Sequence, residues 1–456
     1  MPPGTEFITS PLTLEILKLV GLFILAFTLF QAAEQTLLFW RREDFKKNLR
    51  WVLLEIQIPR ETERNPKAME QVLASLHGLR NAANDLNEYY HDGEVTRWFS
   101  LEMVSFGGEI HFYVRFYFKY RSLVEAAFFA YYPEVELIEV EDYLKRFPQN
   151  IEDMYSKGYE LWGSEMILTK EAAYPIKTYP AFEAIAEEKE YDPISTFLEV
   201  LGKVKKPEMV GIQILLEAET GEWKEKWEKV VDKLKQSKLA REAMHARKAE
   251  TKTEFPGGPL PIFSNEKQET DAFDIFAKAL TRSPGETDVL KAVEDNISKP
   301  AFKATVRFIY FSPKLMFYDS FARRGLVGSF NQYSALDLNS FRQNVKVSTR
   351  LTFWNWPFLF YDVRNRYRKQ RLLYHYLRWK PPQKTFWSKV LSAHPMNWNF
   401  HSKPITLNIE AVATLFHIPR NFVVTAPHIK RIESRKAGPP AGLAIFGEEE
   451  KIQKFL

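Results

Sequence analysis

The chain of 456 residues contains no cysteine and only 19 glycines. The lack of cysteine excludes disulfide bonds, Cys-ligated zinc or iron–sulfur sites and thiol catalysis. The shortage of glycine is unfavourable for phosphate-binding loops, because their backbone must approach the ligand closely. Neither G-x-x-x-x-G-K-[ST] nor H-E-x-x-H occurs in the chain. We therefore expect this chain to be no enzyme and to carry no cofactor or metal.

What the sequence does contain is typical of a folded protein. The apolar fraction is 45 % and the charged fraction 27 %, both ordinary for globular domains. The aromatic fraction is high, at 15 %. At roughly 150 residues per domain, the length suggests about three domains. This composition excludes a disordered chain and a multi-span membrane protein.

One segment near the N-terminus is apolar enough for a membrane anchor. From Leu19 to Ala33, 15 residues carry no charge, a helical length of about 22 Å against a hydrocarbon core of about 30 Å. Including Leu12–Leu17 makes the segment long enough, with Lys18 reaching the headgroups. We predict a short outer tail over residues 1–11 and an anchor helix over 12–40. The alternative is an amphipathic helix lying on a protein or membrane surface.

The charges beside this segment predict its orientation. No Lys or Arg precedes it, whereas Arg41, Arg42, Lys46 and Lys47 follow it. The positive-inside rule then places the N-terminus outside and the rest of the chain in the cytoplasm. The missing basic n-region argues against a signal peptide. We expect a single-pass protein of the inner membrane.

Residues 50–142 show the pattern of a first α+β module. Alternating apolar residues predict strands, and apolar residues at helical spacing predict helices. The strands are expected at Trp51–Ile58, Trp98–Ser105, Glu109–Phe118 and Glu134–Glu141, and the helices at Met69–Leu79 and Ser122–Tyr132. Gly107-Gly108 is a hairpin signal. The order β-α-β-β-α-β is that of the ferredoxin-like motif.

Residues 158–354 repeat this order less clearly. The expected strands are Glu160–Thr169, Val210–Leu216, Phe302–Tyr310 and Val345–Phe353, and the expected helices Ser195–Val204 and Lys314–Phe330. The sequence thus predicts two ferredoxin-like modules in tandem.

An insertion over residues 219–300 separates two strands of the second module. It begins with a charged helix, Glu222–Arg247, whose apolar stripe includes Trp223 and Trp227. Such a stripe is usually a packing face. After the linker Thr251–Ser264 we expect helices at Asp271–Arg282 and Glu286–Ser298, separated by Pro284-Gly285.

Residues 355–456 form a basic, aromatic and mainly helical region in this interpretation. Between Phe341 and Lys436 there are 18 Lys or Arg against three Asp or Glu. This stretch therefore has a net charge of +15, whereas the whole chain has a net charge of only +5. The candidate nucleic-acid-binding residues are Arg364, Arg366, Arg368, Lys369, Arg371, Arg378, Lys380, Tyr367 and Tyr374. They fit single- or double-stranded DNA, through phosphate neutralisation and base stacking. They equally fit anionic membrane lipid, or a solvated face that pairs with an acidic partner or the acidic rest of the chain.

A resemblance emerges near the C-terminus. The run Leu407–Pro419, followed by Ala426-Pro427-His428 and Ser434–Pro440, resembles the segment ahead of the ATPase core in bacterial conjugation-type coupling ATPases of the HerA/FtsK group. The wider layout, with Ser105–Phe112 and Tyr174–Tyr179, is similar to an uncharacterised membrane-anchored N-terminal domain found with such ATPases. The phosphate loop has no counterpart here, so the resemblance implies a motor on a separate polypeptide, or a truncated chain.

These observations favour a non-catalytic, membrane-anchored component of a type IV secretion or conjugation-like apparatus. Its expected partners are a HerA/FtsK-type motor ATPase or other secretion subunits, and DNA that the basic region guides. Two alternatives remain open. One is a membrane-tethered nucleic-acid-binding protein without a motor. The other is a scaffold that assembles with copies of itself into a homo-oligomer.

Overall fold

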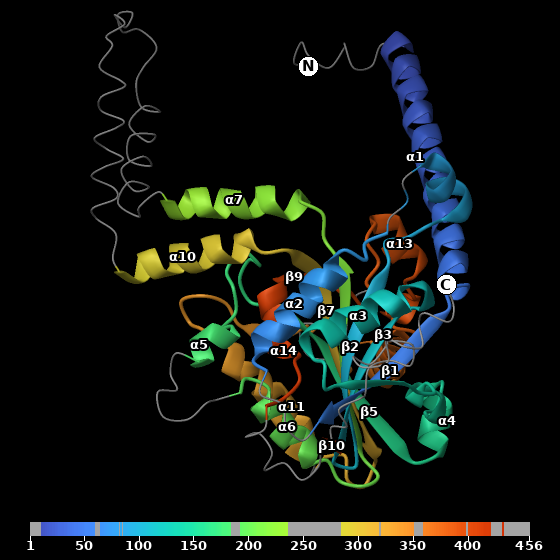
Figure 1. Ribbon diagram of the computed structural model, residues 1–456. Helices are drawn as coiled ribbons and strands as arrows, with labels where there is room; N and C mark the ends of the chain where they lie inside the picture. The colour runs from blue at the N-terminus through green and yellow to red at the C-terminus, as the bar shows by residue number, and fades with distance from the viewer. Residues whose placement is uncertain are drawn as a thin grey trace, which may run out of the picture.

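A long N-terminal helix, α1 (Pro11–Lys47), leads into a mixed α/β body built on a large sheet (Figure 1). The computed structural model describes residues 11–59, 64–81, 83, 85–183, 192–235, 284–318, 321–350, 359–397, 400–420 and 431–432. The predicted tail, the aromatic run at 351–358 and the proline-rich segment after residue 432 lie outside these residues.

The first half of the sheet follows the predicted order of elements. They are β1 (Trp51–Pro59), α2 (Pro66–His77), β2 (Trp98–Phe106), β3 (Glu109–Tyr117), α3 (Arg121–Tyr131) and β4 (Glu136–Glu139). In space the strands lie in the order β4-β1-β3-β2 and pair antiparallel. Gly107 and Gly108 form the tight β2–β3 turn at φ of 58° and 97°, a conformation that glycine adopts without a steric penalty.

The second half has the same arrangement. Its elements are β5 (Tyr159–Leu168), α6 (Ser195–Gly202), β6 (Met209–Ala218), β7 (Ala301–Pro313), α11 (Phe321–Phe330) and β8 (Phe341–Gln343). The strands lie in the order β8-β5-β7-β6, again antiparallel.

The last strand of this half was predicted in the wrong place. It is the short β8, and the expected strand at Val345–Phe353 begins instead as a turn. The Asn344 side chain accepts a hydrogen bond from the backbone N–H of Lys346, and its carbonyl accepts one from Val347. Asparagine forms such local turns readily, so the alternation of apolar residues after it does not produce a strand.

The two halves share one continuous sheet, which has ten strands among the described residues. β2 and β6 pair antiparallel along their length, from Trp98 opposite Glu217 to Phe106 opposite Met209. Both strands are buried almost throughout. Pairing them removes two exposed sheet edges, which would otherwise be open to association with other chains.

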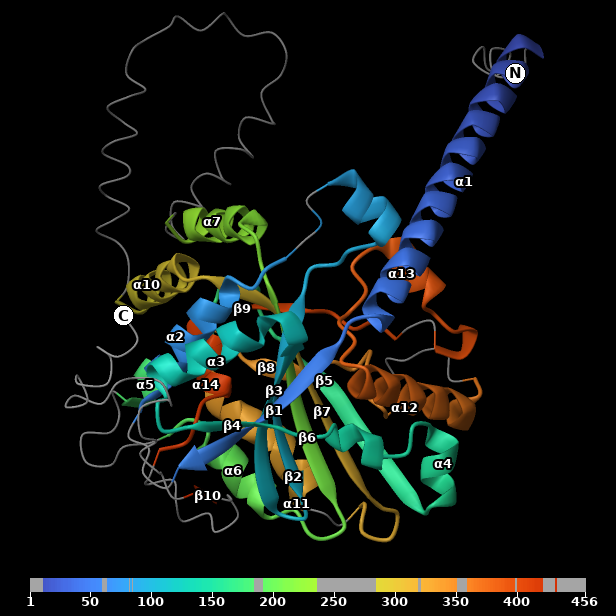
Figure 2. The ribbon, with the colours of Figure 1, turned by 45° about the vertical axis from the view of Figure 1, so that its right-hand side comes forward.

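Helices cover both faces of the sheet (Figures 1 and 2). On one face, α2, α3, α6, α11 and α14 (Ile409–Leu415) close the larger apolar core. On the other face lie α4 (Ile151–Ser156) and α12 (Tyr361–Leu377). The predicted helix at Leu407–Pro419 is the end of β9 (Ile405–Asn408), which pairs with β7, followed by α14. The short β10 (Arg431–Ile432) pairs parallel with β1.

The described part of the insertion is a pair of helices, α7 (Glu222–Lys235) and α10 (Pro284–Ser298). The apolar stripe of α7, with Trp223 and Trp227, packs against Leu290 and Val293 of α10. α10 begins two residues before the predicted helix Glu286–Ser298. Pro284 and Gly285, predicted as a break, form its first turn, where proline is well tolerated. The predicted linker, the helix Asp271–Arg282 and the second half of the charged helix lie outside the described residues.

Candidate functional site

The first part of α1 stands clear of the body (Figure 2). Its apolar side chains are exposed on all sides of the helix, as at Phe23, which is 73 % exposed. Within Glu15–Lys47 the mean hydropathy of the most apolar window is 2.1, and none of that window is buried. By length and composition this helix fits a membrane span or an N-terminal signal sequence.

The second part of α1 is built into the fold. Leu38 is almost fully buried. The Glu43 carboxylate lies 2.7 Å from Nζ of Lys380, from the loop after α12, and Lys46 lies 3.1 Å from the same carboxylate. Although burial raises the pKa of Glu43, the nearby Lys46 and Lys380 outweigh it and the pKa is lowered. This ion pair joins the helix to the C-terminal region.

Two short elements flank this second part of α1. One is the π-helical turn η1 (Asn87–Asp92), where the Tyr90 hydroxyl donates to Glu34 over 2.8 Å and Arg42 lies 4.8 Å from the Tyr89 ring centre. The other is α13 (Phe386–Leu391). Of the predicted anchor-flank residues, Arg41 and Lys47 are exposed, whereas Arg42 and Lys46 are half-buried in these contacts.

The structure separates the nine predicted nucleic-acid-binding residues into different environments. Arg366, Tyr367, Tyr374 and Arg378 are exposed, Arg371 and Lys380 are half-buried, and Arg364, Arg368 and Lys369 are buried. The nine residues therefore do not form one exposed stripe, since α12 turns part of its basic residues toward the sheet.

Arg368 illustrates the buried group. Its guanidinium donates to the backbone carbonyls of Ser348 and Val345, each over 2.9 Å. Burial, reinforced by Arg364 and Arg371, lowers its pKa to about 10. Lys369 instead lies 2.7 Å from Glu160 of β5. In this arrangement neither side chain can reach a phosphate, and both fix α12 to the body.

A row of polar residues crosses the sheet face beneath α12. Glu102, Gln213, Arg307 and Glu165 are direct neighbours in register on β2, β6, β7 and β5. Arg307 donates to Glu165 at 2.8 Å and to Gln213 at 3.2 Å. All four are buried. Because buried polar groups need hydrogen-bond partners, the segment that packs on this row must supply donors and acceptors to it.

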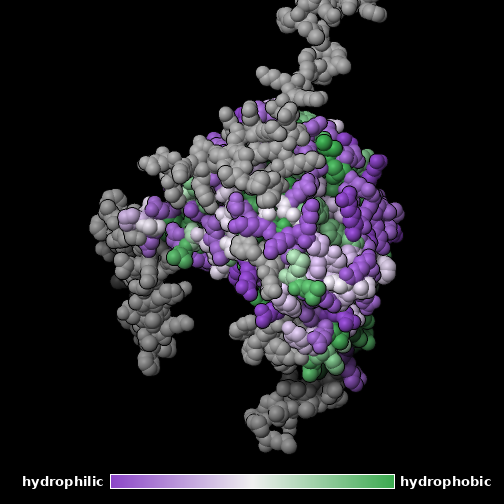
Figure 3. Space-filling model, turned by 90° about the horizontal axis from the view of Figure 1, so that it is seen from below, coloured by the Kyte–Doolittle hydropathy of each residue, from purple (hydrophilic) through white to green (hydrophobic). Residues whose placement is uncertain are grey.

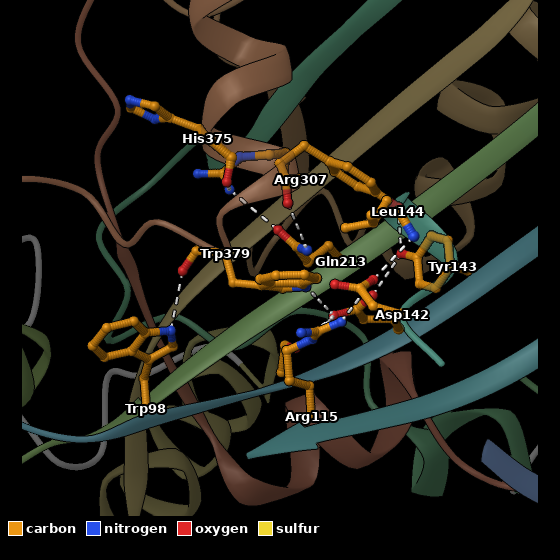
Figure 4. Close-up of polar contacts among 12 residues, drawn as sticks. Trp98, Arg115, Asp142, Tyr143, Leu144, Gln213, Arg307, His375 and Trp379 are labelled. Atoms are coloured by element: carbon orange, nitrogen blue, oxygen red, sulfur yellow. Dashed lines mark hydrogen bonds and ion pairs between the residues drawn. The ribbon is translucent and has the colours of Figure 1, made fainter. Parts of the chain in front are cut away.

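The end of α12 and the residues after it supply those partners (Figure 4). Arg307 donates to the carbonyls of His375 and Lys380. Trp379 donates its indole N–H to Glu102 over 2.6 Å, and the guanidinium carbon of Arg115 lies 3.1 Å from a Trp379 ring centre. Tyr143 donates to Glu102 over 2.6 Å. The network thus joins both halves of the sheet to the C-terminal region.

Two glycines on the sheet allow α12 to approach this face. A Cβ at Gly211 of β6 would stand 2.0 Å from the Tyr376 hydroxyl, and one at Gly163 of β5 would stand 2.8 Å from a Leu372 methyl and 2.5 Å from the Phe308 carbonyl oxygen. Side chains in real structures do not approach so closely. The scarce glycines therefore serve close helix–sheet packing here, at positions that sequence patterns alone do not single out.

A basic groove of about 700 Å³ lies between the end of β5, β8 and the start of β9. Its lining includes Lys170, Arg342, Lys346, His401 and Lys403, with Glu171 as its acidic member. Burial, together with Lys346, Lys389 and Arg371, lowers the pKa of His401, which reflects the positive surroundings. The sequence contained these residues, but they come from three distant segments, so their convergence was not predicted.

The segment Leu407–Pro419, which resembles the sequence ahead of a motor domain, is held in the fold by buried hydrogen bonds. Nε2 of His417 lies 2.6 Å from Asp192, and both residues are fully buried. Thr414 accepts from the backbone N–H of Tyr179, whose hydroxyl donates to Glu70. Across the described ranges, no group of three His, Asp or Glu side chains could hold a metal ion.

The structure thus defines a mixed α/β protein with a large antiparallel sheet and one N-terminal helix long and apolar enough to cross a membrane. Residues 30–353, more than half of the chain, match the family described as Domain of unknown function (DUF8128). The chain belongs to this family. A search of curated proteins finds no match.

Proposed function

We propose that the chain is a membrane-anchored, non-catalytic component of a type IV secretion or conjugation-like apparatus, which holds a separate motor ATPase near the inner membrane. The observation that carries this proposal is α1, whose first part is free and apolar and whose second part is held in the fold. A cleaved signal sequence needs no such contacts. The pairing of Glu43 with Lys380 fixes the proposed anchor to the body.

The charge pattern supports an orientation with the body in the cytoplasm. Arg41 and Lys47 are exposed just beyond the apolar stretch, on the side that the positive-inside rule assigns to the cytoplasm. The cytoplasm is also the compartment that supplies ATP to a motor ATPase bound to the body.

We further propose that each half of the sheet is a ferredoxin-like module. The order of elements and the strand orders β4-β1-β3-β2 and β8-β5-β7-β6 are those of the split β-α-β-β-α-β motif. α14, in the segment that resembles a motor lead-in, contacts α2 of the first half and α5 (Tyr179–Glu183), which lies between β5 and α6 of the second. This buried segment therefore joins the two proposed modules.

Affinity purification of the full chain from its native membranes tests the proposal. We expect a phosphate-loop ATPase of the HerA/FtsK group, or another secretion subunit, to be enriched. Recovery of neither a motor nor a secretion subunit with the unaltered chain would contradict the proposal.

The basic groove supports a second candidate function, the binding of single-stranded nucleic acid. Arg342, Lys346 and Lys403 are exposed around it and could neutralise successive phosphates. This moves the predicted nucleic-acid contact from α12 to the groove.

Charge reversal distinguishes the two surfaces. We expect the triple variant R342E/K346E/K403E to lose most of its affinity for single-stranded DNA at low salt. The slope of log affinity against log salt concentration should fall by about 0.7 for each phosphate that the variant no longer neutralises. R366E/R378E, on the exposed side of α12, is the matched control and should bind normally. Weakened binding in the control alone would place the DNA on α12, and no binding by the unaltered chain would remove this function.

A further inference from the structure

An exposed apolar surface surrounds α1 where it enters the body. It is made of η1 with the residue before it, of α13, and of the outward face of α1. Its members are Leu86, Tyr89, Phe386, Trp387, Leu391 and Trp40, all of which are exposed. Leu86 and Phe386 are 76 % and 71 % exposed. We call these residues the collar.

The collar comes from three distant parts of the chain, and both η1 and α13 contact α1. Tyr90 bonds to Glu34, the first charged residue after the uncharged stretch that begins at Leu19. A Cβ at Gly93, just after η1, would stand 2.6 Å from the backbone of Arg41, so this segment packs directly on the helix. α13, which follows the loop that carries Lys380, also contacts α1 (Figures 1 and 2).

We propose that the collar lies in the interface of an anionic bilayer and holds the folded body against the membrane. This inference rests on the proposed membrane anchor. Once Leu12–Ala33 spans the hydrocarbon core, the residues beside Glu34 are at headgroup depth. Exposed aromatic and aliphatic side chains are stable there, and Tyr and Trp are enriched at that depth.

The charges of α13 agree with an anionic surface. Phe386, Trp387, Val390 and Leu391 are exposed, and the exposed Lys389 lies among them. A short apolar face with lysine beside it is the composition of interfacial helices. By contrast, the described surface at the opposite end of the body is mainly hydrophilic, with hydrophobic residues in small separate patches (Figure 3).

The absence of cysteine makes the test site-specific, because any introduced cysteine is unique. The full chain is prepared as F386C and L86C for the collar and as F23C for the anchor, each carrying a nitroxide spin label. L315C is the matched aqueous control. Leu315 is 96 % exposed and follows β7 at Pro313, the end away from α1.

Each labelled chain is reconstituted in vesicles of phosphatidylcholine with phosphatidylglycerol, and the label's accessibility to oxygen and to a water-soluble nickel chelate is measured. We expect the oxygen-to-nickel ratio at residues 386 and 86 to be several-fold above that at 315 and below that at 23. In vesicles of phosphatidylcholine alone the collar ratio should fall.

The outcomes separate this inference from the anchor on which it rests. If residues 386 and 86 give the ratio of residue 315 while residue 23 lies in the bilayer, the collar proposal is overturned and the anchor stands. If residue 23 is also in water, both fail. An unchanged collar ratio in the uncharged vesicles would contradict the role of anionic lipid.

Discussion

At the scale of single residues, the packing of α12 depends on Gly211. Its substitution by alanine would place a methyl group 2.0 Å from the Tyr376 hydroxyl, so Tyr376 or the strand must move. We expect G211A to lower the free energy of unfolding by about 1–3 kcal/mol, as overpacking of a core does. The matched control is G221A, because a Cβ there meets nothing within 4 Å. Equal stability of the two variants, measured by denaturant unfolding in detergent, would contradict this packing.

His375 gives the fold a pH dependence at the same scale. It is buried, Nδ1 has no hydrogen-bond partner among the described residues, and burial with Arg307, Arg371 and Lys380 holds its pKa well below the usual value. As the pH falls through about 6.5, the unfolded chain therefore gains a proton that the folded chain does not.

Stability should consequently fall as the pH is lowered below about 6.5, by up to about 1.4 kcal/mol per pH unit from this residue. We expect the H375F variant to lose less stability than the unaltered protein between pH 7 and pH 5. Denaturant midpoints across this range measure the difference. Identical slopes for the two proteins would show that the pKa of His375 is not lowered in the folded state.

The sequence pattern predicted local secondary structure better than it predicted which side chains are buried. The apolar stripe on α7 reflects the burial of one face of that helix against α10, which a sequence pattern carries directly. The burial of Arg368 depends on carbonyls of Ser348 and Val345, in a turn that was itself predicted as a strand. A basic run looks the same whether its partners are phosphates or backbone carbonyls.

At the scale of elements, the ion pair between Glu43 and Lys380 joins α1 to the loop after α12. Both side chains are largely buried, so their coupling should exceed that of an exposed pair. In a double-mutant cycle with E43Q and K380M, we expect a coupling of about 1 kcal/mol. The control cycle uses Glu141 and Lys145, an exposed pair, with an expected coupling of at most about 0.5 kcal/mol. Equal values would mean that the pair does not hold α1 in place.

The order of the helices and strands along the chain was predicted, whereas the pairing of the two halves into one sheet was not. Each half of the sheet follows the β-α-β-β-α-β order read from the sequence. The pairing of β2 with β6 could not be predicted, because two buried strands look alike whether they lie in one sheet or in two. The basic groove was missed for a related reason, since Lys170, Arg342 and Lys403 meet only through the pairing of β5 with β8 and of β7 with β9.

At the scale of the whole molecule, the polar network under α12 makes the two halves and the C-terminal region one unit. Arg307 bonds within the sheet and to the carbonyls of His375 and Lys380, and Lys380 pairs with Glu43 of α1. Contacts therefore run from the proposed anchor, through the C-terminal region, to the centre of the sheet. A partner that binds the body would be held at a fixed position relative to the membrane.

The central claim is that α1 anchors this body on the cytoplasmic side of the inner membrane. The most direct measurement is labelling of the L315C variant in spheroplasts with a membrane-impermeant maleimide, followed by fractionation. We predict that the protein sediments with membranes and is labelled only after the spheroplasts are lysed. Labelling of intact spheroplasts, or recovery of the full-length chain in the soluble fraction, would contradict the account.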